Sequence, residues 1–432
     1  DTIFAAATGY GRAAICVIRV SGPATRQILE TVAGGVPAAR RLVLRNLKSA
    51  AGEHLDQGLV VWLPGPQSFT GEDQAELHIH GGLATRNAVV QALHGMEGCR
   101  AADPGEFTRR AFLNGRMDLS RAEGLGDLID AETEAQRKQA LRQLEGGLGQ
   151  KVEAWREELL QILAGLEAAL DFSDEEDVPD ETEHKAGLRI GAVRHAIGDL
   201  LDRPSGERLR EGFTVVLAGP PNAGKSTLLN AVAKREVAIV SPFAGTTRDL
   251  IEVRCDLGGL PVTFVDTAGL RDSAHPVEQE GVLRARERAR SADLVLWLVP
   301  PDAPQDLVPV TGPDVITIAT KHDIGPPHYP FDFAISAWTG DGIPALLDLL
   351  REKAENGVGH GDAVVTRERH RHALREAHAS LGGALAQLDS EGPLELVAED
   401  VRLAARAVGR ISGRVDVEDV LDRLFSNFCI GK

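Results

Sequence analysis

Hydrophobic positions change their spacing along the chain, and each change predicts a different kind of structure. In residues 1–117, short apolar and β-branched runs alternate with turn residues such as those at 64–66 and 81–82. The runs at 15–20, 59–63 and 75–80 are typical of strands. We therefore expect an α+β domain in residues 1–117.

From residue 119 to about residue 170 the spacing becomes helical. The apolar residues that mark one face of a helix at three- and four-residue spacing are Val152, Trp155, Leu159, Ile162, Leu166 and Leu170. The acidic run 171–180, which contains Pro179, interrupts the pattern, so we expect a solvated connection there. A metal site in that run is less favoured, because its carboxylates lack an organised ligand loop. The chain is helical again from Thr366 to Phe428.

Between residues 213 and 355, strands alternate with helices. The runs expected to form strands are 214–218, two strands around the Gly258–Gly259 turn, 294–299, 315–319 and 333–335. This alternation is typical of a mainly parallel sheet that is covered on both faces. We therefore predict a multidomain α/β protein with an N-terminal α+β domain (1–117) and an all-α helical domain in two halves (118–210 and 358–432). The inserted α/β domain spans 211–357.

Composition narrows the class of protein. The chain has 432 residues, 43% of them hydrophobic, and no run of 18 apolar residues, so we expect several soluble domains and no membrane span. The first ten residues lack a basic segment before an apolar one, which argues against a secretory signal. Four scattered cysteines fit a reducing, cytoplasmic setting better than a disulfide framework.

The formal charge of −17 is unevenly distributed. Residues 1–117 contain 12 basic and 10 acidic residues, whereas the remainder contains 35 basic and 54 acidic ones. Such an acidic remainder repels phosphate backbones, and the aromatic content of 4% is too low for a platform that stacks many bases. Any contact with RNA should therefore be local or shared with a partner.

A phosphate-binding loop is predicted at residues 219–226, which read Gly-Pro-Pro-Asn-Ala-Gly-Lys-Ser. The segment fits G-x-x-x-x-G-K-[ST] and lies directly between an apolar strand and a helix. In this context backbone N–H groups cradle phosphates, Lys225 neutralises the β- and γ-oxygens, and the Ser226 hydroxyl can bind Mg²⁺.

Further nucleotide-binding motifs follow in order. Asp266–Thr267–Ala268–Gly269 ends the apolar strand 262–265 and brings a carboxylate near the metal and a glycine amide near the γ-phosphate. Lys321 and Asp323 follow one strand, and Ser336–Ala337 follow the next, so both loops should meet a purine at the carboxyl edge of the sheet. An Asp carboxylate can accept hydrogen bonds from guanine N1 and N2, which predicts guanine.

Two departures from GTP-binding domains have consequences. These domains have an Asn-Lys-x-Asp box, but this chain has Thr320 in place of Asn, and Thr lacks the paired donor and acceptor of an amide. We expect guanine selection to persist through Asp323 with somewhat weaker nucleotide affinity. The residue after Gly269 is Leu270, where Ras-like domains have a water-orienting Gln, and we assign that role to Glu278.

The motifs of the whole chain resemble the MnmE (TrmE) family of tRNA uridine-modifying GTPases. The segments that carry the resemblance are the phosphate-binding loop, Gly245–Asp249, the last four residues Cys429–Lys432, and, in the N-terminal part, 1–3, 11–12, 19–22, 68–73, 80–82, 104–108 and 110–116. The resemblance implies an N-terminal domain that dimerises and binds tetrahydrofolate, and a Ras-like P-loop GTPase domain inserted in a helical domain. It also implies a heterotetramer with the flavoprotein MnmG and an aminomethyl-type modification at C5 of the wobble uridine in certain tRNAs.

The resemblance also implies metal ligands. Asn222, Ser241, Phe243 and Thr246 match the positions that hold K⁺, Thr247 joins Ser226 on Mg²⁺, and Glu278 matches the catalytic Glu that positions water. A fixed cation between β- and γ-phosphates offsets charge that develops in the transition state. The complete predicted GTP-binding set is Asn222, Ala223, Gly224, Lys225, Ser226, Thr227, Ser241, Pro242, Phe243, Ala244, Gly245, Thr246, Thr247, Asp266, Thr267, Ala268, Gly269, Lys321, Asp323, Ser336 and Ala337.

For 5-formyltetrahydrofolate or a related folate, the resemblance implies Arg19, Glu76, Arg116 and Lys432 as binding residues. Glu76 can accept hydrogen bonds from the pterin N–H edge, and the cations suit the glutamate tail. Cys429 is either a buried structural thiol or a functional thiol near the folate. His78 and His80 alternate on a strand, where hydrogen-bonded histidines are favoured over a metal pair.

These features lead to one function and one alternative. The first is a K⁺-stimulated GTP hydrolase that works as a homodimer with MnmG on tRNA, where the partner supplies much of the positive surface. The alternative is a ribosome-assembly GTPase that uses the same switch, although that function calls for a basic RNA-binding domain and residues beyond 360 do not form one.

Overall fold

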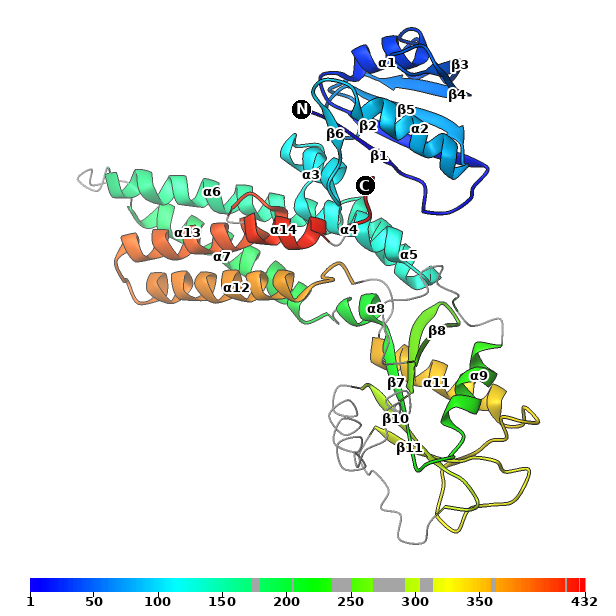
Figure 1. The fold of residues 1–432 in the computed structure, drawn as a ribbon. Helices are drawn as coiled ribbons and strands as arrows, with labels where there is room; N and C mark the ends of the chain where they lie inside the picture. The colour runs from blue at the N-terminus through cyan, green and yellow to red at the C-terminus, as the bar shows by residue number, and fades with distance from the viewer. Residues whose placement is uncertain are drawn as a thin grey trace, which may run out of the picture. The chain divides into compact units, whose positions relative to one another are not determined.

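The computed structural model describes residues 1–171, 179–203, 206–234, 239, 251–266, 292–303, 314–358, 363–415, 418–426 and 428–431. Figure 1 shows its helices and strands in order along the chain. The elements fall into an N-terminal α+β domain, a set of long helices and a second domain built on a parallel sheet, which confirms the multidomain α/β class.

The N-terminal domain is built on a six-stranded sheet. Its elements are β1 (Thr2–Ala6), β2 (Ile15–Ser21), α1 (Thr25–Ala33), β3 (Val43–Lys48), β4 (His54–Leu63), β5 (Gln74–His80), α2 (Leu83–His94), β6 (Cys99–Ala101) and α3 (Glu106–Leu113). The strand order is β3-β4-β5-β2-β1-β6, and every neighbouring pair is antiparallel except β1 and β6. The three strands expected from the sequence are β2, β4 and β5.

One face of this sheet is covered by α1 and α2. Ile28 and Leu29 of α1, and Val89 and Leu93 of α2, pack with alternate residues of the strands, such as Leu77 of β5. Because neighbouring strand residues point to opposite faces, the residues between these buried ones form the other face of the sheet. The half-covered sheet explains why the strand runs alternate between apolar and polar positions.

The long helices agree with the helical spacing in the sequence. They are α4 (Leu119–Asp130), α5 (Glu134–Leu144), α6 (Gly149–Asp171), α7 (Pro179–Leu201), α12 (Glu368–Asp389), α13 (Leu394–Ser412) and α14 (Glu418–Ser426). Helices α6 and α13, from the two halves of the predicted helical domain, pack against each other. In the predicted apolar stripe of α6, Val152, Leu159, Ile162 and Leu166 are buried, while Trp155 and Leu170 are only half-buried.

The predicted connection at 171–180 is shorter than expected. Residues 172–178 lie outside the described residues, but α6 includes Asp171 and α7 begins at Pro179. Proline is compatible with the first turn of a helix, because the N–H that it lacks has no partner within the helix there. Pro179 therefore begins a helix where the sequence pattern predicted only an interruption.

The second domain contains the mainly parallel sheet. Its elements are α8 (Glu207–Glu211), β7 (Phe213–Ala218), α9 (Lys225–Ala233), β8 (Ile251–Leu257), β9 (Leu260–Asp266), β10 (Leu294–Val299), β11 (Val315–Ala319), β12 (Phe333–Ala334) and α11 (Ile343–Val358). The strand order is β12-β11-β10-β7-β9-β8, and only β8 runs antiparallel to its neighbour. The parallel strands therefore end at the same edge of the sheet.

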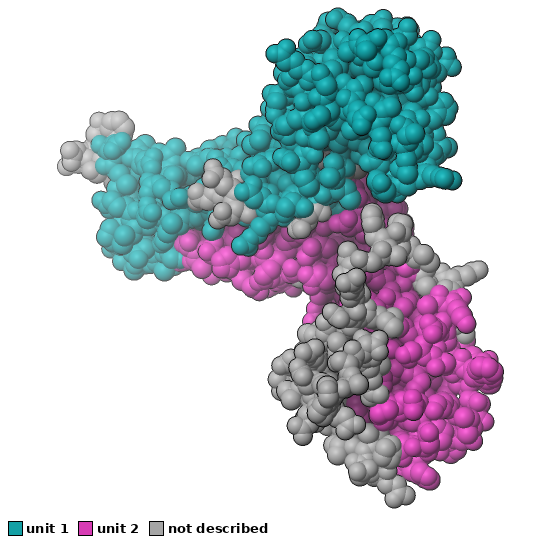
Figure 2. Space-filling view, viewed as in Figure 1, with its two compact units in different colours: residues 1–126, 144–190, 383–432 teal, residues 127–143, 191–382 magenta. Residues whose placement is uncertain are grey.

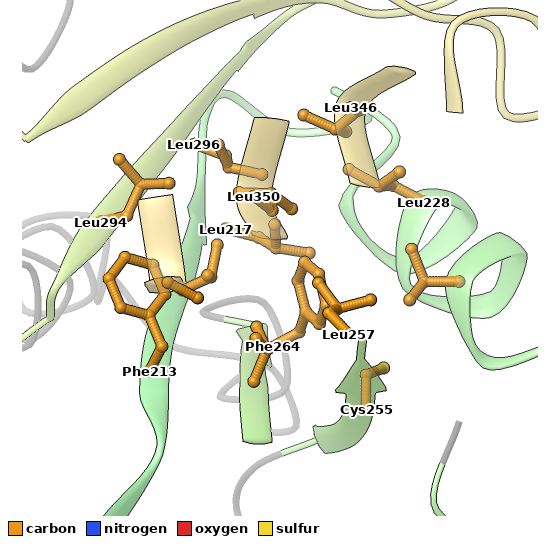
Figure 3. Packing of buried hydrophobic residues seen from close by; sticks show 14 of the residues in the cluster. Phe213, Leu217, Leu228, Cys255, Leu257, Phe264, Leu294, Leu296, Leu346 and Leu350 are labelled. Atoms are coloured by element: carbon orange, nitrogen blue, oxygen red, sulfur yellow. The ribbon is translucent and has the colours of Figure 1, made fainter. Parts of the chain in front are cut away.

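Helices α9 and α11 cover one face of this sheet. Figure 3 shows the packing of Leu228 of α9 and Leu346 and Leu350 of α11 around strand residues such as Leu217 and Phe264. On the opposite face, Val216, Val265, Val295 and Val299 are also buried. Burial on both faces explains why these strands are nearly continuous apolar runs.

Contacts along the chain divide it into two compact units (Figure 2). One unit comprises residues 1–126, 144–190 and 383–432, and the other comprises 127–143 and 191–382. Helix α5 thus belongs mainly to the unit that contains the parallel sheet. The domain boundaries predicted at 117, 210 and 357 follow the sequence motifs and stay predictions. Among the described helices, none is long and apolar enough to span a membrane.

Candidate functional site

The loop between β7 and α9 has the backbone of a phosphate cradle. Gly219 has φ of +146°, and a Cβ there would lie 2.4 Å from the carbonyl oxygen of Leu298, so this position requires glycine. Gly224 has φ of +91° and precedes α9, and Asn222 has φ of +60°. Glycine adopts such positive φ values most readily, and asparagine adopts them more readily than most other residues. The sequence thus forms the predicted strand-loop-helix, with the N-terminus of α9 facing the loop.

Lys225 is the first residue of α9, and its ammonium group lies within the loop. Its Nζ atom donates hydrogen bonds of 2.9 Å to the carbonyl oxygens of Gly219 and Pro220, and the residue is only 9% exposed. These bonds hold a positive charge beside the N–H groups at the start of the helix. This is the arrangement that favours an anion such as a phosphate.

Ser226 and Asp266 meet beside this loop. The Ser226 hydroxyl donates a hydrogen bond of 2.9 Å to Oδ2 of Asp266, which is the last residue of β9 and is fully buried. Parallel pairing of β7 and β9 brings the two residues together, because both strands end at this edge. Hydroxyl and carboxylate oxygens are the donors that Mg²⁺ prefers, so the pair fits a magnesium site.

The two predicted base-recognition loops lie next to each other at the same edge. The N–H of His322 donates to the carbonyl oxygen of Ile335 over 3.1 Å, which joins the loop after β11 to the one after β12. Lys321 has φ of +52°, Asp323 is exposed, and Ser336 is buried. The N–H of Ser336 donates to the carbonyl oxygen of Asp341, which closes the second loop. Ala337 follows in this loop.

One contact was missed by sequence reasoning. Thr320, which we considered only as a weaker base ligand, donates a hydrogen bond of 2.7 Å from its hydroxyl to the carbonyl oxygen of Ala223. The bond joins the base-recognition loop to the phosphate-binding loop. The chance of predicting it was small, because the two residues are 97 positions apart in the chain.

Much of the predicted switch region cannot be compared with the structure. The predicted nucleotide-site residues that lie outside the described ones are Ser241, Pro242, Phe243, Ala244, Gly245, Thr246, Thr247, Thr267, Ala268, Gly269 and the catalytic candidate Glu278. Their assignments stay predictions. Of the four predicted K⁺ ligands only Asn222 is described, and Thr227 lies in the first turn of α9.

A second group of predicted residues gathers on the open face of the N-terminal sheet. Arg19 of β2 pairs in register with Glu76 of β5, and the Arg19 Nε atom donates a 3.1 Å hydrogen bond to Glu76 Oε1. The other carboxylate oxygen of Glu76 lies 3.2 Å from Nε2 of His78. Both side chains of the Arg19–Glu76 pair remain about one quarter exposed. The open face thus presents a carboxylate and a guanidinium side by side.

Arg116 borders the same region through the loop at 68–73. A Cβ added to Gly71 would lie 3.4 Å from the Arg116 side chain, and the Phe69 ring lies 5.9 Å from the Arg19 guanidinium carbon. Thr70 holds the loop through a buried 2.7 Å hydrogen bond with the Ser21 hydroxyl. The motif at 68–73 therefore contacts both arginines, and Phe69 is a neighbour that sequence reasoning did not single out.

The C-terminal tail contacts the first strand of this sheet. A Cβ on Gly431 would lie 2.7 Å from the carbonyl oxygen of Ala6, and the neighbouring residue Ala5 pairs in register with Arg19. Cys429 is an exposed free thiol, so the alternative of a buried structural thiol is wrong. Lys432 lies outside the described residues.

The strand histidines have hydrogen-bonding partners, as favoured from the sequence. His80 Nδ1 lies 2.8 Å from Asp56 Oδ1, and His78 contacts Glu76. Within the part of the chain that the structure describes, no group of three or more His, Cys, Asp or Glu side chains could hold a metal ion.

A network of ion pairs in the N-terminal domain includes Glu106. Burial acts to raise the pKa of this carboxyl group, but hydrogen bonds from Arg100, the Asp103 backbone and Arg110 outweigh it and lower the pKa to about 2. The Arg100 and Arg110 guanidinium groups lie 2.6 and 3.0 Å from Glu106 Oε1. Glu106 thus anchors the start of α3 as a carboxylate at neutral pH.

Comparisons with known proteins cover the entire chain. A family model described as "GTP-binding protein TrmE N-terminus" matches residues 2–116, and one described as "MnmE helical domain" matches residues 119–429. Proteins named "tRNA modification GTPase MnmE" from Methylobacterium sp. (strain 4-46) and Methylorubrum populi are 60% and 59% identical. Both alignments cover 100% of this chain, and they cover 100% and 98% of the length of the respective relatives.

Among solved structures, a variant of Aquifex aeolicus Era bound to GDP.AlF4- is 24% identical over 39% of this chain and 66% of its own, with a TM-score of 0.26. The sequence relatives and the family models carry the assignment without it.

Proposed function

The chain belongs to the MnmE family of tRNA modification GTPases, and from this premise we propose that GTP hydrolysis in the parallel-sheet domain serves tRNA modification. The finer proposal is that the chain works with the flavoprotein MnmG and modifies C5 of the wobble uridine in certain tRNAs. A tetrahydrofolate supplies the one-carbon unit. The alternative, a ribosome-assembly switch, is not favoured by the family models or by the relatives.

The single observation that best supports GTP hydrolysis is the arrangement of Lys225, Ser226 and Asp266. The Lys225 ammonium lies in the loop, and the hydroxyl and the buried carboxylate are 2.9 Å apart at the same sheet edge. Phosphoryl transfer depends chiefly on positioning and on stabilising negative charge, which this arrangement provides. Asp323 then selects guanine, and Glu278 orients the attacking water.

We propose that this site binds two cations through oxygen ligands. Ser226 with Thr247 would hold Mg²⁺ beside Asp266, and Asn222 with Ser241, Phe243 and Thr246 would hold K⁺. When bound, these ions neutralise charge on the phosphates. Asn222 would contribute its side-chain oxygen, and its φ of +60° lies in the tight turn of the loop.

Hydrolysis rates in K⁺ and in Na⁺ at matched ionic strength test the potassium site. We expect faster hydrolysis in K⁺, and we expect Asn222→Gly to reduce this difference, because glycine keeps the left-handed backbone and removes only the side-chain ligand. Equal rates in both salts for the unchanged protein would contradict the K⁺ proposal while leaving GTP hydrolysis intact.

The folate proposal is supported by the open face of the N-terminal sheet. Glu76 is held by Arg19 and stays partly exposed, so one of its oxygens can accept a hydrogen bond from a pterin N–H group. Arg116 and the tail that ends in Lys432 add positive charge for a glutamate carboxylate. Retention of 5-formyltetrahydrofolate by the purified protein is the test, and no retention at micromolar folate would contradict the assignment of Arg19, Glu76, Arg116 and Lys432.

A homodimer is supported by exposed apolar residues of the N-terminal domain. Leu44 and Leu59 lie opposite each other in register and are 57% and 40% exposed, and Leu42 and Ile15 are 53% and 59% exposed. Because large exposed apolar patches mark interaction sites, we propose a second copy of this chain as the partner that covers them. Leu44→Glu with Leu59→Glu should give a monomer by light scattering, whereas the double change Leu188→Glu and Leu396→Glu on exposed helix positions should not.

Charge supports a shared tRNA surface. The chain has a formal charge of −17, which is unfavourable for binding a polyanion, so we propose that MnmG contributes most of the basic contacts. tRNA binding by this chain alone should then be weak and should strengthen when MnmG is added. Tight binding of tRNA without MnmG would contradict this division.

A further inference from the structure

Thr320 connects two loops that contact different parts of a nucleotide. It is 4% exposed, lies directly after β11, and donates its hydroxyl proton to the carbonyl oxygen of Ala223, which is fully buried. The backbone of Gly224 is also close, since a Cβ added there would lie 3.9 Å from the Thr320 Cβ. The side chain of Thr320 is therefore enclosed against the phosphate-binding loop.

The geometry leaves the hydroxyl without a second proton. A threonine hydroxyl has one O–H donor, whereas an asparagine amide has two N–H donors. Guanine N7 carries a lone pair and no hydrogen, so it can only accept a hydrogen bond. With its proton on Ala223, the Thr320 oxygen can accept from a nucleotide but cannot donate to N7.

We propose that Thr320 is a positioning residue that fastens the base-recognition loop to the phosphate-binding loop and leaves guanine N7 without a donor from this position. The inference rests on the GTP binding proposed above. Guanine selection in this chain then depends on Asp323 and the N1 and N2 edge of the base. An amide at position 320 could keep the contact with Ala223 and also reach N7.

An analogue that lacks N7 tests the base contact. In 7-deaza-GTP a carbon replaces N7, while the N1 and N2 edge that Asp323 reads is unchanged. The unchanged protein should bind GTP and 7-deaza-GTP with dissociation constants within about twofold. Thr320→Asn should tighten GTP by about three- to tenfold with little gain for 7-deaza-GTP, as expected for one added hydrogen bond. A tenfold loss for 7-deaza-GTP in the unchanged protein, or no preference for GTP in Thr320→Asn, would overturn the base contact part.

Removal of the hydroxyl tests the positioning role. Thr320→Val keeps the shape of the side chain but leaves the buried Ala223 carbonyl without this partner, and we expect GTP to bind about tenfold more weakly and to dissociate faster. Thr320→Ser keeps the hydroxyl and should stay within about threefold of the unchanged protein. GTP affinity in folded Thr320→Val equal to that of the unchanged protein would overturn the positioning role.

A matched control separates this effect from a general loss of stability. Thr366 is 1% exposed and donates a 2.7 Å hydrogen bond to Gln143 in the same compact unit, but it belongs to neither loop. Thr366→Val should lower the melting temperature and leave GTP affinity within about twofold. An equal loss of GTP affinity in Thr366→Val would reduce the Thr320 effect to stability and would overturn the proposal.

The outcomes also separate this inference from the proposed function. Failure of the unchanged protein to bind GTP would contradict the proposed function itself. Normal GTP binding with a strong preference over 7-deaza-GTP would contradict only the inference about Thr320. If Thr320→Val does not fold by circular dichroism, Thr320→Asn and the analogue still decide the question.

Discussion

The two six-stranded sheets of this protein present functional groups in different ways. The mainly antiparallel N-terminal sheet is covered by α1 and α2 on one face, and Arg19 and Glu76 project from the other face. On that other face, among the described residues, α3 covers only Ile3 and Ala5 of β1, through Phe107, and the Arg19–Glu76 pair stays about one quarter exposed. The parallel sheet is buried on both faces, and Lys225, Ser226 and Asp266 gather where its strands end. The candidate folate residues Arg19 and Glu76 are strand residues, while the candidate nucleotide residues lie in loops, at a strand end and at a helix N-terminus.

The difference has a physical cause. Antiparallel sheets can leave one face to solvent, so alternate strand residues become available for ligands. Parallel sheets need crossover connections that bury both faces, so chemistry moves to the loops at the carboxyl edge. Register therefore holds the first site as one rigid face, whereas the second depends on contacts between loops, such as that of Thr320 with Ala223. Four predictions test this division, from the largest expected effect to the smallest.

Lys225→Ala should have the largest effect. It removes the charge held within the phosphate-binding loop, and we expect kcat/KM for GTP to fall by about 100-fold or more. Lys234→Ala, at the other end of α9, is the matched control and should hydrolyse GTP normally. Folate binding should be unchanged in both variants, and a loss of folate binding in Lys225→Ala would contradict the independence of the two sites.

Glu76→Gln should affect only the open face. The substitution removes the carboxylate that Arg19 holds, and we expect folate to bind about tenfold more weakly by titration. GTP hydrolysis measured without tRNA should stay within about twofold. The matched control is His80→Gln, an exposed position at the end of the same strand, which should bind folate normally. Equal losses in both variants would count against a role for Glu76.

Glu106→Gln should change the pH dependence of stability. The folded-state pKa of Glu106 is lowered from 4.5 to about 2, so its contribution is complete above about pH 4.5 and is lost as pH falls toward 2. At pH 7 the variant should lose about 1–3 kcal/mol of unfolding free energy in urea titrations. The difference from the unchanged protein should shrink between pH 4.5 and pH 2. A difference that is constant over this range would contradict the ion-pair explanation, and Glu97→Gln outside this network is the control.

Arg254→Gln should have the smallest effect. Arg254 of the edge strand β8 lies 3.2 Å from Glu132, and its side chain is 57% exposed. Exposed ion pairs contribute about 1 kcal/mol or less and weaken with salt. We expect a small decrease in melting temperature that disappears at high ionic strength. A large, salt-independent decrease would show that this edge contributes more to stability than its exposure implies.

Local patterns predicted much of the fold because they depend on nearest neighbours. The runs at 75–80 and 294–299 were predicted to form strands, and both strands are present. The loop at 219–226 was predicted because its glycines, lysine and serine stand at a fixed spacing within one short segment of the chain. The helix start at Pro179 was missed because proline and clustered acids resemble a break when packing is unknown.

The sequence by itself determined which groups are available for chemistry: the phosphate-binding loop, the carboxylate at Asp266, Asp323 as the proposed guanine-reading residue, and the family to which the chain belongs. Only the tertiary structure decided which of these groups meet. Strand register brought Arg19 beside Glu76, and the shared edge of the parallel strands brought Thr320 to Ala223 and Ser226 to Asp266. Such contacts join residues that are 40 to 97 positions apart, and the order of strands in a sheet sets them, which no local pattern encodes.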